Sequence, residues 1–359
     1  MAFPHNKILE IVSLPLSRLR ERIQRTTNTA ETSTAEPVKE QIAQPEPVES
    51  PKPDEPRPQR YLVFSDTGND LATIDNTLRF AGIRDPEGGL VDDLQGLTLV
   101  HTGDLLNKRQ PDPWVVEYWC NLQRHVAARG GAVKLIVGNH ELEIWQRLQQ
   151  GKKKPEISPD EAELYRSFIP QMDLFHVSGN LLFIHGYPTL GLMRTLLHYT
   201  QVTGRNPNQF NHDHYRKAFK SVEAIRQYSY VRKDRKGGYL LYDPDNLDSY
   251  YKKKGREISR VLEALNINTV IHGHRPQRSG IQADYEFGQW LPGIRMIGND
   301  IGIRRGEIGA ALFHEVDAAQ PAIHFINRKN RSKKHRKRLL KTLDGTRSES
   351  LRQATSPGP

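Results

Sequence analysis

The chain has 359 residues, of which 36% are hydrophobic and 26% charged, enough for one large domain or two average domains. No apolar run approaches the roughly 20 residues of a membrane-spanning helix, which argues against an integral membrane protein. The single cysteine, Cys120, excludes a disulfide framework and a zinc site built from cysteines. We therefore expect a cytoplasmic protein in which Cys120 packs in an apolar core.

The net charge of +10 is concentrated at the carboxyl end of the chain. Residues 328–352 hold eleven lysines and arginines against two acidic residues, whereas residues 61–327 are close to neutral. Residues 328–359 are therefore expected to form a basic, largely disordered tail that contacts polyanions nonspecifically. Because the tail has no aromatic residue on which a base could stack, its sequence does not favour a dedicated nucleic-acid site.

The amino-terminal 60 residues divide into two parts of different composition. Residues 1–25 have apolar side chains at helical spacing, which predicts a short amphipathic helix that docks on the body or stays loose. Peripheral contact with a membrane surface or a partner is the alternative. Glu10 in the apolar part and the lack of a small-residue cleavage site argue against a secretory signal. Residues 26–60, rich in threonine, proline and glutamate, are expected to be a disordered linker.

Residues 61–327 alternate between apolar runs of strand length and helical patterns, which predicts an α/β sheet with crossover connections. Helices are predicted from Leu71 to Ala81, over 113–129, and over most of 190–266 with a break at 234–246. The predicted strands are 61–65, 97–102, 132–137, 180–186, 267–274, 293–300, 309–315 and 322–327.

Five of these strands are followed directly by polar residues of the kind that bind metals. The residues are Asp66, Asp104, Asn139 with His140, His185, and His272 with His274. Because ligand sites in open α/β sheets lie at the carboxyl ends of strands, we expect these side chains to converge. Mixed oxygen and imidazole donors suit manganese, iron or zinc. A carboxylate such as Asp104 could bridge two ions about 3.5–4 Å apart, which is the spacing that activates water for phosphoryl displacement.

The stretch from Phe80 to Ile144 contains "HTGDLLNK" and "ARGGAVKLIVGNHE", and "VIHGH" follows at 270–274. In these motifs the chain resembles the calcineurin-like metallophosphoesterases of the phosphoprotein-phosphatase type, and among them the bacterial Shewanella-like phosphatases. The resemblance covers about residues 60–327, which are therefore expected to be the metallophosphoesterase domain. It implies an α/β fold in which a β-sandwich is flanked by helices (αββα) and binds two divalent metal ions at one edge.

The resemblance also implies a role for each motif residue. The second ion would bind Asp104, Asn139, His185 and His274, and the first ion would bind Asp66 and Asp104. His140 would be the general acid that protonates the leaving oxygen, and a metal-activated water would be the nucleophile. Manganese is the favoured ion, with iron or zinc as alternatives.

The first motif departs from the family pattern at a metal ligand. It reads "DTG" instead of DxH, so Gly68 stands where a metal-binding histidine is expected. We therefore expect a weak first metal site. His272 is retained as a candidate ligand, whereas His101, on an apolar strand, is better explained as a core histidine.

A second departure follows Asp104, where the family's GDxxDRG reads "GDLLNKRQ". Asn107 replaces the aspartate that orients the catalytic histidine, and Lys108 replaces an arginine that binds phosphate. A lysine retains the positive charge but loses the bidentate fork of the guanidinium group. Arg109 is the candidate substitute for that arginine.

These observations favour a metal-dependent phosphomonoesterase. The resemblance alone implies a phosphoprotein substrate, phosphorylated on Ser/Thr or Tyr, with a Ser/Thr-type phosphatase as the expected activity. Small phosphoesters, nucleotides and dinucleoside polyphosphates are the alternative substrates. A rival interpretation is a phosphatase-fold binding module without turnover, suggested by Gly68 and Asn107. A polar cluster that is costly to bury argues for the enzyme. An RNA-associated protein acting through the basic tail is a third class.

Overall fold

The computed structural model describes residues 59–85, 88–151, 157–226, 228, 240–241, 244–274, 290–300, 309–314 and 322–327. The predicted amino-terminal helix, all but the last two residues of the predicted linker, and the basic tail lie outside these residues. Within the described part of the chain, no helix combines the length and the apolar character needed to cross a bilayer.

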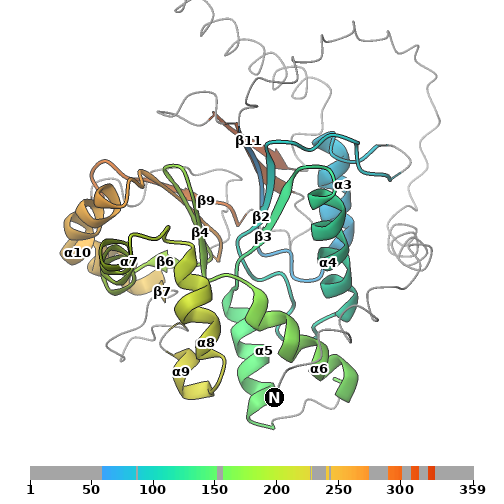
Figure 1. Cartoon of the computed structure of the whole chain (residues 1–359), viewed down its shortest axis with the longest axis horizontal. Helices are drawn as coiled ribbons and strands as arrows, with labels where there is room; N and C mark the ends of the chain where they lie inside the picture. Colours follow the sequence, from blue (N-terminus) through green and yellow to red (C-terminus); the bar gives the residue numbers. More distant parts are fainter. Residues whose placement is uncertain are drawn as a thin grey trace, which may run out of the picture.

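One half of the molecule is built on a five-stranded sheet with the strand order β11-β10-β1-β2-β3 (Figure 1). Strands β1, β2 and β3 run parallel to one another, whereas β10 and β11 pair antiparallel. Their bounds are β1 Arg60–Phe64, β2 Leu97–His101, β3 Ala132–Leu135, β10 Gly309–His314 and β11 Ala322–Asn327.

A four-stranded sheet with the order β4-β5-β8-β9 forms the other half. Strands β5, β8 and β9 are parallel, and β4 pairs antiparallel with β5. The bounds are β4 Phe175–Ser178, β5 Leu181–Ile184, β8 Thr269–His272 and β9 Arg295–Gly298, with a small additional pair formed by β6 Tyr187–Pro188 and β7 Leu240–Leu241.

The two sheets pack face to face through a layer of apolar side chains. This layer consists of Tyr61, Val63, Val100, Ile136, Leu181, Phe183, Ile271 and Ile297. The alternate residues of β1, Leu62 and Phe64, belong to a larger core that includes the helices, and Phe64 meets the edge of Trp119 at 5.8 Å between ring centroids. Both faces of β1 are therefore buried, which is why the strand reads as a continuous apolar run.

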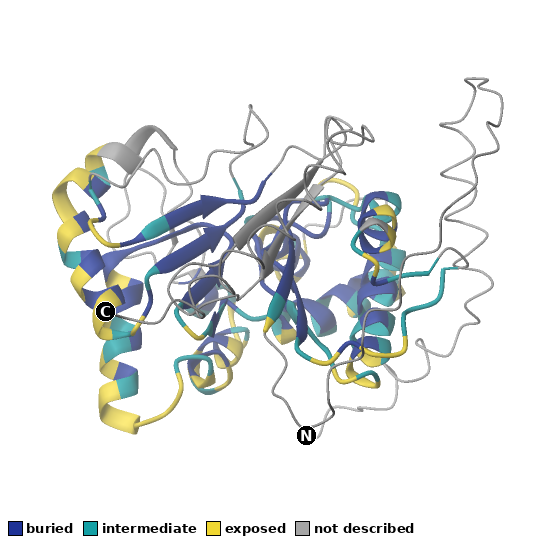
Figure 2. Cartoon of the chain, turned by 90° about the horizontal axis from the view of Figure 1, so that it is seen from above, coloured by how far each residue is buried: buried dark blue, intermediate teal, exposed yellow. Residues whose placement is uncertain are grey.

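Helices cover the outer faces of both sheets. Helices α3 and α4 lie beside the five-stranded sheet, and α7 and α10 lie beside the four-stranded sheet (Figure 1). The central strands β1, β2, β5 and β8 are almost wholly buried (Figure 2). This helix–sheet–sheet–helix arrangement confirms the predicted αββα sandwich. The helices are α3 Leu71–Phe80, α4 Pro113–Ala127, α5 Asn139–Gln149, α6 Pro159–Phe168, α7 Leu190–Thr203, α8 Arg216–Ala218, α9 Val222–Arg226 and α10 Pro244–Ala264, with a 3₁₀ turn η1 at Ile169–Gln171 and a π-helical turn η2 at Asn211–Tyr215.

All eight strands predicted from the sequence are present, and several further elements, among them β4, α5 and α6, were not predicted. Strand β4 has only four residues, two of them His176 and Ser178, so its apolar signal is weak. Helix α5 begins inside the GNHE motif and α6 follows it, and neither was predicted. Helix α10 begins at Pro244, within the predicted break, because proline is tolerated in the first turn of a helix.

Two asparagine side chains occupy the open edge of β4. The Asn211 side chain accepts a hydrogen bond from the backbone N–H of Leu174 at 2.9 Å and donates to the carbonyl of Phe175 at 2.8 Å. Asn208 makes the same pair of bonds with Val177, both at 2.7 Å. The two amides therefore take the hydrogen-bonding positions of a neighbouring strand, which protects an edge that could otherwise pair with another chain.

We predict that Asn211→Ala lowers the free energy of unfolding by about 2 kcal/mol or more, because it leaves a buried N–H and a buried carbonyl without partners. Urea denaturation measures the loss. Asn76→Ala, on the exposed face of α3, is the matched control and should change stability by less than about 0.5 kcal/mol. Equal losses in the two variants would contradict the role assigned to Asn211.

Candidate metal centre

The loops that follow four strands meet at one edge of the sandwich. Asp66 follows β1, Asp104 follows β2, His185 follows β5 and His274 follows β8, while Asn139 is the first residue of α5 after β3. The first two loops remain paired beyond their strands, because the backbone N–H of Asp66 donates to the carbonyl of Gly103 at 3.0 Å and that of Gly68 donates to the carbonyl of Asp104 at 3.1 Å. The sheet topology thus places these predicted ligands at a common edge.

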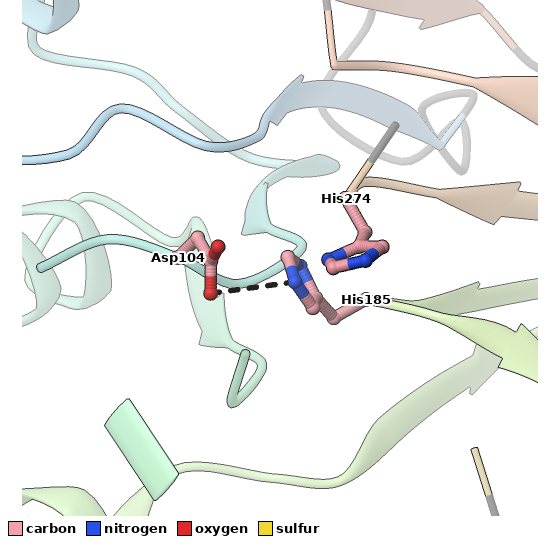
Figure 3. A group of neighbouring side chains, drawn as sticks. All are labelled: Asp104, His185 and His274. Atoms are coloured by element: carbon pink, nitrogen blue, oxygen red, sulfur yellow. Dashed lines mark ion pairs between the residues drawn. The ribbon is translucent and has the colours of Figure 1, made fainter. Parts of the chain in front are cut away.

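Three of these residues form a compact cluster (Figure 3). One ligand atom from each of Asp104, His185 and His274 lies within 4.8 Å of the other two. The Nε2 atom of His185 is 3.3 Å from Asp104 Oδ1 and 3.1 Å from Asn139 Oδ1. Asp104 and His185 are buried and His274 is half-buried. These four side chains are the ligands that the family resemblance assigned to the second metal ion.

The protonation of His185 fits a divalent cation at this point. Its Nδ1 atom is 2.7 Å from the backbone carbonyl of Thr102, which can only accept, so Nδ1 carries the proton. In the neutral ring the lone pair of Nε2 then points toward the Asp104 and Asn139 oxygens. A metal ion bound here would accept electron pairs from all three of these atoms. The backbone carbonyl on Nδ1 is also the usual outer partner of a metal-binding histidine.

Backbone strain is concentrated at the same residues. Asp66, Asp104 and His274 have φ angles of 52°, 55° and 72°, in the left-handed region that non-glycine residues rarely adopt. Such conformations cost about 1–3 kcal/mol each and gather at functional sites, where the surrounding structure enforces them. The strain therefore marks the loops after β1, β2 and β8 as a functional site independently of their side chains.

Two motif glycines allow these loops to approach one another. A Cβ atom at Gly273 would lie 2.1 Å from the Ser65 hydroxyl and 2.8 Å from Asp66 Oδ2. A Cβ atom at Gly138 would lie 2.3 Å from the backbone nitrogen of Asp104. Any larger residue would therefore push the ligand-bearing loops apart.

The first metal position has fewer protein donors. The carboxylate of Asp66 accepts from the Ser65 hydroxyl at 2.5 Å and from the backbone N–H of His274 at 2.9 Å, which fixes it beside the cluster. Gly68, where the family has a histidine, has a φ of 54°. Within the described part of the chain, the one group of three metal-type side chains is the Asp104–His185–His274 cluster, and Asp66 is not a member.

Neither neighbouring histidine is a member of the Asp104–His185–His274 cluster. His101 is fully buried with its ring edge-on to Trp119, its Nδ1 accepts from the Gly103 N–H at 3.2 Å, and its Nε2 is 2.9 Å from the Thr67 hydroxyl. Burial, with the charge of His185 as a smaller cause, lowers its pKa to about 3, so His101 is a neutral core residue. His272, a candidate ligand from the sequence, packs against the Tyr187 ring at 4.4 Å between centroids.

His140 lies beside the cluster at the start of α5. Its Nδ1 atom is 2.9 Å from the carbonyl oxygen of Leu106, and its Nε2 atom is 3.2 Å from Asp104 Oδ2. The backbone N–H of His140 also donates to Asp104 Oδ1 at 2.9 Å. Both ring nitrogens therefore face oxygen acceptors, so the ring can hold a proton at Nε2, next to the Asp104 carboxylate.

The remaining candidates, Asn107, Lys108 and Arg109, lie in the loop after β2. The Asn107 side chain accepts from the backbone N–H groups of Arg109 and Gln110, at 2.9 and 3.4 Å. The Lys108 ammonium lies 3.8 Å from the exposed carboxylate of Glu143 on α5, and Arg109 is exposed. The structure thus places positive charge on the loop beside the site, and it places the Asn107 amide in a local turn.

Glu141 is a residue of this site that sequence reasoning missed. It is fully buried, and its carboxylate accepts from the backbone N–H groups of Asp104 at 3.1 Å, Leu106 at 2.7 Å and Gly138 at 2.8 Å. Burial raises the pKa of Glu141 to about 7, and the backbone donors oppose that rise. A glutamate three residues after Gly138, at the start of a helix, is the capping-box signal that could have revealed it.

Comparison with protein-family models shows the family to which the chain belongs. Residues 59–278 match the family of calcineurin-like phosphoesterases, a match that spans more than half of the sequence. The chain therefore belongs to this family, as its motifs predicted. Comparison with curated proteins gave no match.

Comparison with solved structures gave matches that include a protein-tyrosine phosphatase and a metallophosphoesterase. One is the cold-active protein-tyrosine phosphatase of a psychrophilic Shewanella species, with 16% identity, a TM-score of 0.48, and coverage of 74% of this chain and 80% of that one. Another is a metallophosphoesterase from Sphaerobacter thermophilus, with 14% identity, a TM-score of 0.37, and coverage of 76% and 88%.

We predict that His185→Ala weakens binding of Mn²⁺ or Zn²⁺ at least about 100-fold, because removal of even an outer partner of a metal ligand typically costs 10- to 100-fold. Isothermal titration of metal-free protein measures the affinity. The matched control is His176→Ala, which removes a half-buried imidazole stacked on Phe183 outside the cluster and should leave the affinity unchanged. Unchanged metal affinity in His185→Ala would show that His185 is not a ligand.

Proposed function

We propose that this protein is a metal-dependent phosphomonoesterase of the phosphoprotein-phosphatase type. One observation carries the proposal: the Asp104–Asn139–His185–His274 set, buried at Asp104 and His185, has the His140 ring, the proposed proton donor, in contact with the Asp104 carboxylate. Membership of the calcineurin-like phosphoesterases supports the metal-dependent chemistry. The GDLLNK and GNHE motifs, which resemble those of phosphoprotein phosphatases, support the choice of substrate class.

A divalent ion, when bound, supplies an acidified water and stabilises negative charge on the phosphoryl group. The chain supplies the proton for the leaving oxygen. The carbonyl of Leu106 holds Nδ1 of His140, so the Nε2 atom is the one that delivers a proton. Asp104 Oδ2 lies 3.2 Å from this nitrogen and accepts a hydrogen bond from it. This contact keeps the proton on Nε2 until it is transferred to the leaving oxygen.

The two metal positions are proposed to differ in affinity. The second position has four protein ligands, whereas the first has Asp66 and the shared Asp104. Since a tightly bound transition ion usually has three or four protein ligands, the first ion depends more on water and substrate oxygens. Manganese is the proposed activator, with iron or zinc as alternatives.

A test of the function is hydrolysis of an aryl phosphate with and without Mn²⁺. We expect turnover that chelation abolishes, and we expect His140→Ala to retain metal while losing about 10²- to 10⁴-fold in kcat, the usual contribution of a general acid. Comparing a phosphoserine peptide, a phosphotyrosine peptide and a dinucleoside polyphosphate identifies the substrate class.

Three results would count against this function. Turnover without metal, or a trapped phosphoenzyme, would contradict a metal-activated water as nucleophile. Tight binding of phosphate or a phosphopeptide with no turnover would support the rival candidate, a binding module, which the substitution at Gly68 favours.

The difference between the metal positions gives a separate prediction. We expect one ion per chain to survive dialysis, and turnover to rise with added Mn²⁺ well after that ion has saturated. Metal content by atomic emission and turnover as a function of metal concentration measure the two quantities. Two ions retained through dialysis would mean that a further residue completes the first position.

A further inference from the structure

The ring of His140 is oriented by a backbone carbonyl. Its Nδ1 atom meets the Leu106 carbonyl oxygen at 2.9 Å, and both groups are buried. The Leu106 peptide is in turn fixed by Glu141, whose Oε1 atom accepts from the Leu106 N–H at 2.7 Å. A chain of two hydrogen bonds therefore connects a buried carboxylate to the proposed general acid.

The same carboxylate also fixes the metal-ligand loop. Glu141 Oε2 accepts from the backbone N–H groups of Asp104 and Gly138, at 3.1 and 2.8 Å. Asp104 is held in a left-handed conformation, so its position depends on bonds that outweigh this strain. Glu141 thus ties the loop that carries the shared metal ligand to the helix that carries His140.

The Asn107 side chain does not orient His140. Its side-chain oxygen accepts from the N–H groups of Arg109 and Gln110, and its own N–H donates to Asn69 Oδ1 at 3.0 Å. Its amide is therefore committed to a turn in the loop after β2. A carboxyl group that orients His140 directly is absent from position 107, and the Leu106 carbonyl occupies Nδ1 instead.

We propose that Glu141, acting through the Leu106 peptide, is the positioning residue for His140, in the place of a side chain at position 107. This inference rests on the proposed function, because it concerns the proton delivered to the leaving oxygen. Glu141 does not touch the substrate. It keeps the Leu106 carbonyl on Nδ1 and thereby directs Nε2 of His140.

The three N–H donors explain why a carboxylate is needed. A carboxylate has two acceptor oxygens and no donor, so it can receive all three bonds. A glutamine of the same size has one acceptor oxygen, and its NH₂ group would face at least one backbone N–H. Glu141→Gln therefore keeps the volume of the side chain while it loosens the anchored peptides.

The test compares substrates that differ in their need for a proton. Loss of a well-placed general acid affects esters of strongly basic leaving groups most, because weakly basic leaving groups depart without protonation. We expect Glu141→Gln to lower kcat for phenyl phosphate about tenfold more than for 2,4-dinitrophenyl phosphate, within the range that a general acid contributes. A purely structural loss would lower kcat equally for both substrates.

Two further variants calibrate this comparison. Glu163→Gln makes the same change on an exposed face of α6 and should leave both rates unaltered. His140→Ala should show the largest difference between the two substrates. Equal losses for both substrates in Glu141→Gln, at a metal content and melting temperature like those of the parent, would overturn the inference.

A measurement without turnover separates this inference from the proposed function. In ¹⁵N-histidine-labelled protein, the His140 Nδ1–H proton should resonate as a protected signal, identified by its loss in His140→Ala. We expect Glu141→Gln to shift this signal and to speed its exchange with water, whereas an unchanged signal would overturn the inference. An inactive parent with the expected shift would refute the proposed function and leave the positioning by Glu141 supported.

Discussion

The site depends on the fixed conformation of Asp104. Its backbone N–H binds Glu141, its carbonyl accepts from Gly68, and its carboxylate contacts His140 and His185. These bonds join the loops after β1, β2 and β5 to the start of α5, and they hold Asp104 at a φ of 55°. Because Asp104 supplies both the proposed bridging carboxylate and the contact to His140, the proposed proton donor, the proposed function makes metal binding and acid catalysis depend together on this loop.

The rigidity of this loop comes from the sandwich behind it. Strands β1 and β2 are parallel neighbours with both faces buried, so their carboxyl ends cannot shift relative to each other without opening a packed core. The glycines of the motifs then allow the loops to come within van der Waals distance, as at Gly273, where a Cβ atom would collide with Ser65. Close backbone packing therefore substitutes for the long side-chain contacts that would otherwise be needed to gather the ligands.

One departure from the family pattern falls in the loop after β1 and another in the loop after β2. The cluster of Asp104, His185 and His274 is intact, whereas the position served by Asp66 lacks the imidazole that Gly68 replaces. His101 cannot compensate, because its two nitrogens are already bonded to Gly103 and Thr67. Around His140 the change concerns the group that orients the ring. The Leu106 carbonyl contacts Nδ1, and the carboxylate that holds the Leu106 peptide belongs to Glu141, the residue after His140 in α5.

The sequence by itself determined the strand pattern, the family and the residues at the strand ends, because apolar runs and the GD, GNHE and GH motifs are local signals. It could not reveal β4, whose apolar signal is short, nor the asparagine amides that cover its edge, since these contacts join residues more than 30 positions apart. Only the tertiary structure decided which histidines gather beside Asp104: His185 and His274 lie in its cluster, whereas the rings of His101 and His272 pack against Trp119 and Tyr187. It also decided the part played by Glu141, because a buried carboxylate acquires its role from three backbone N–H groups that meet only when the loops are folded together.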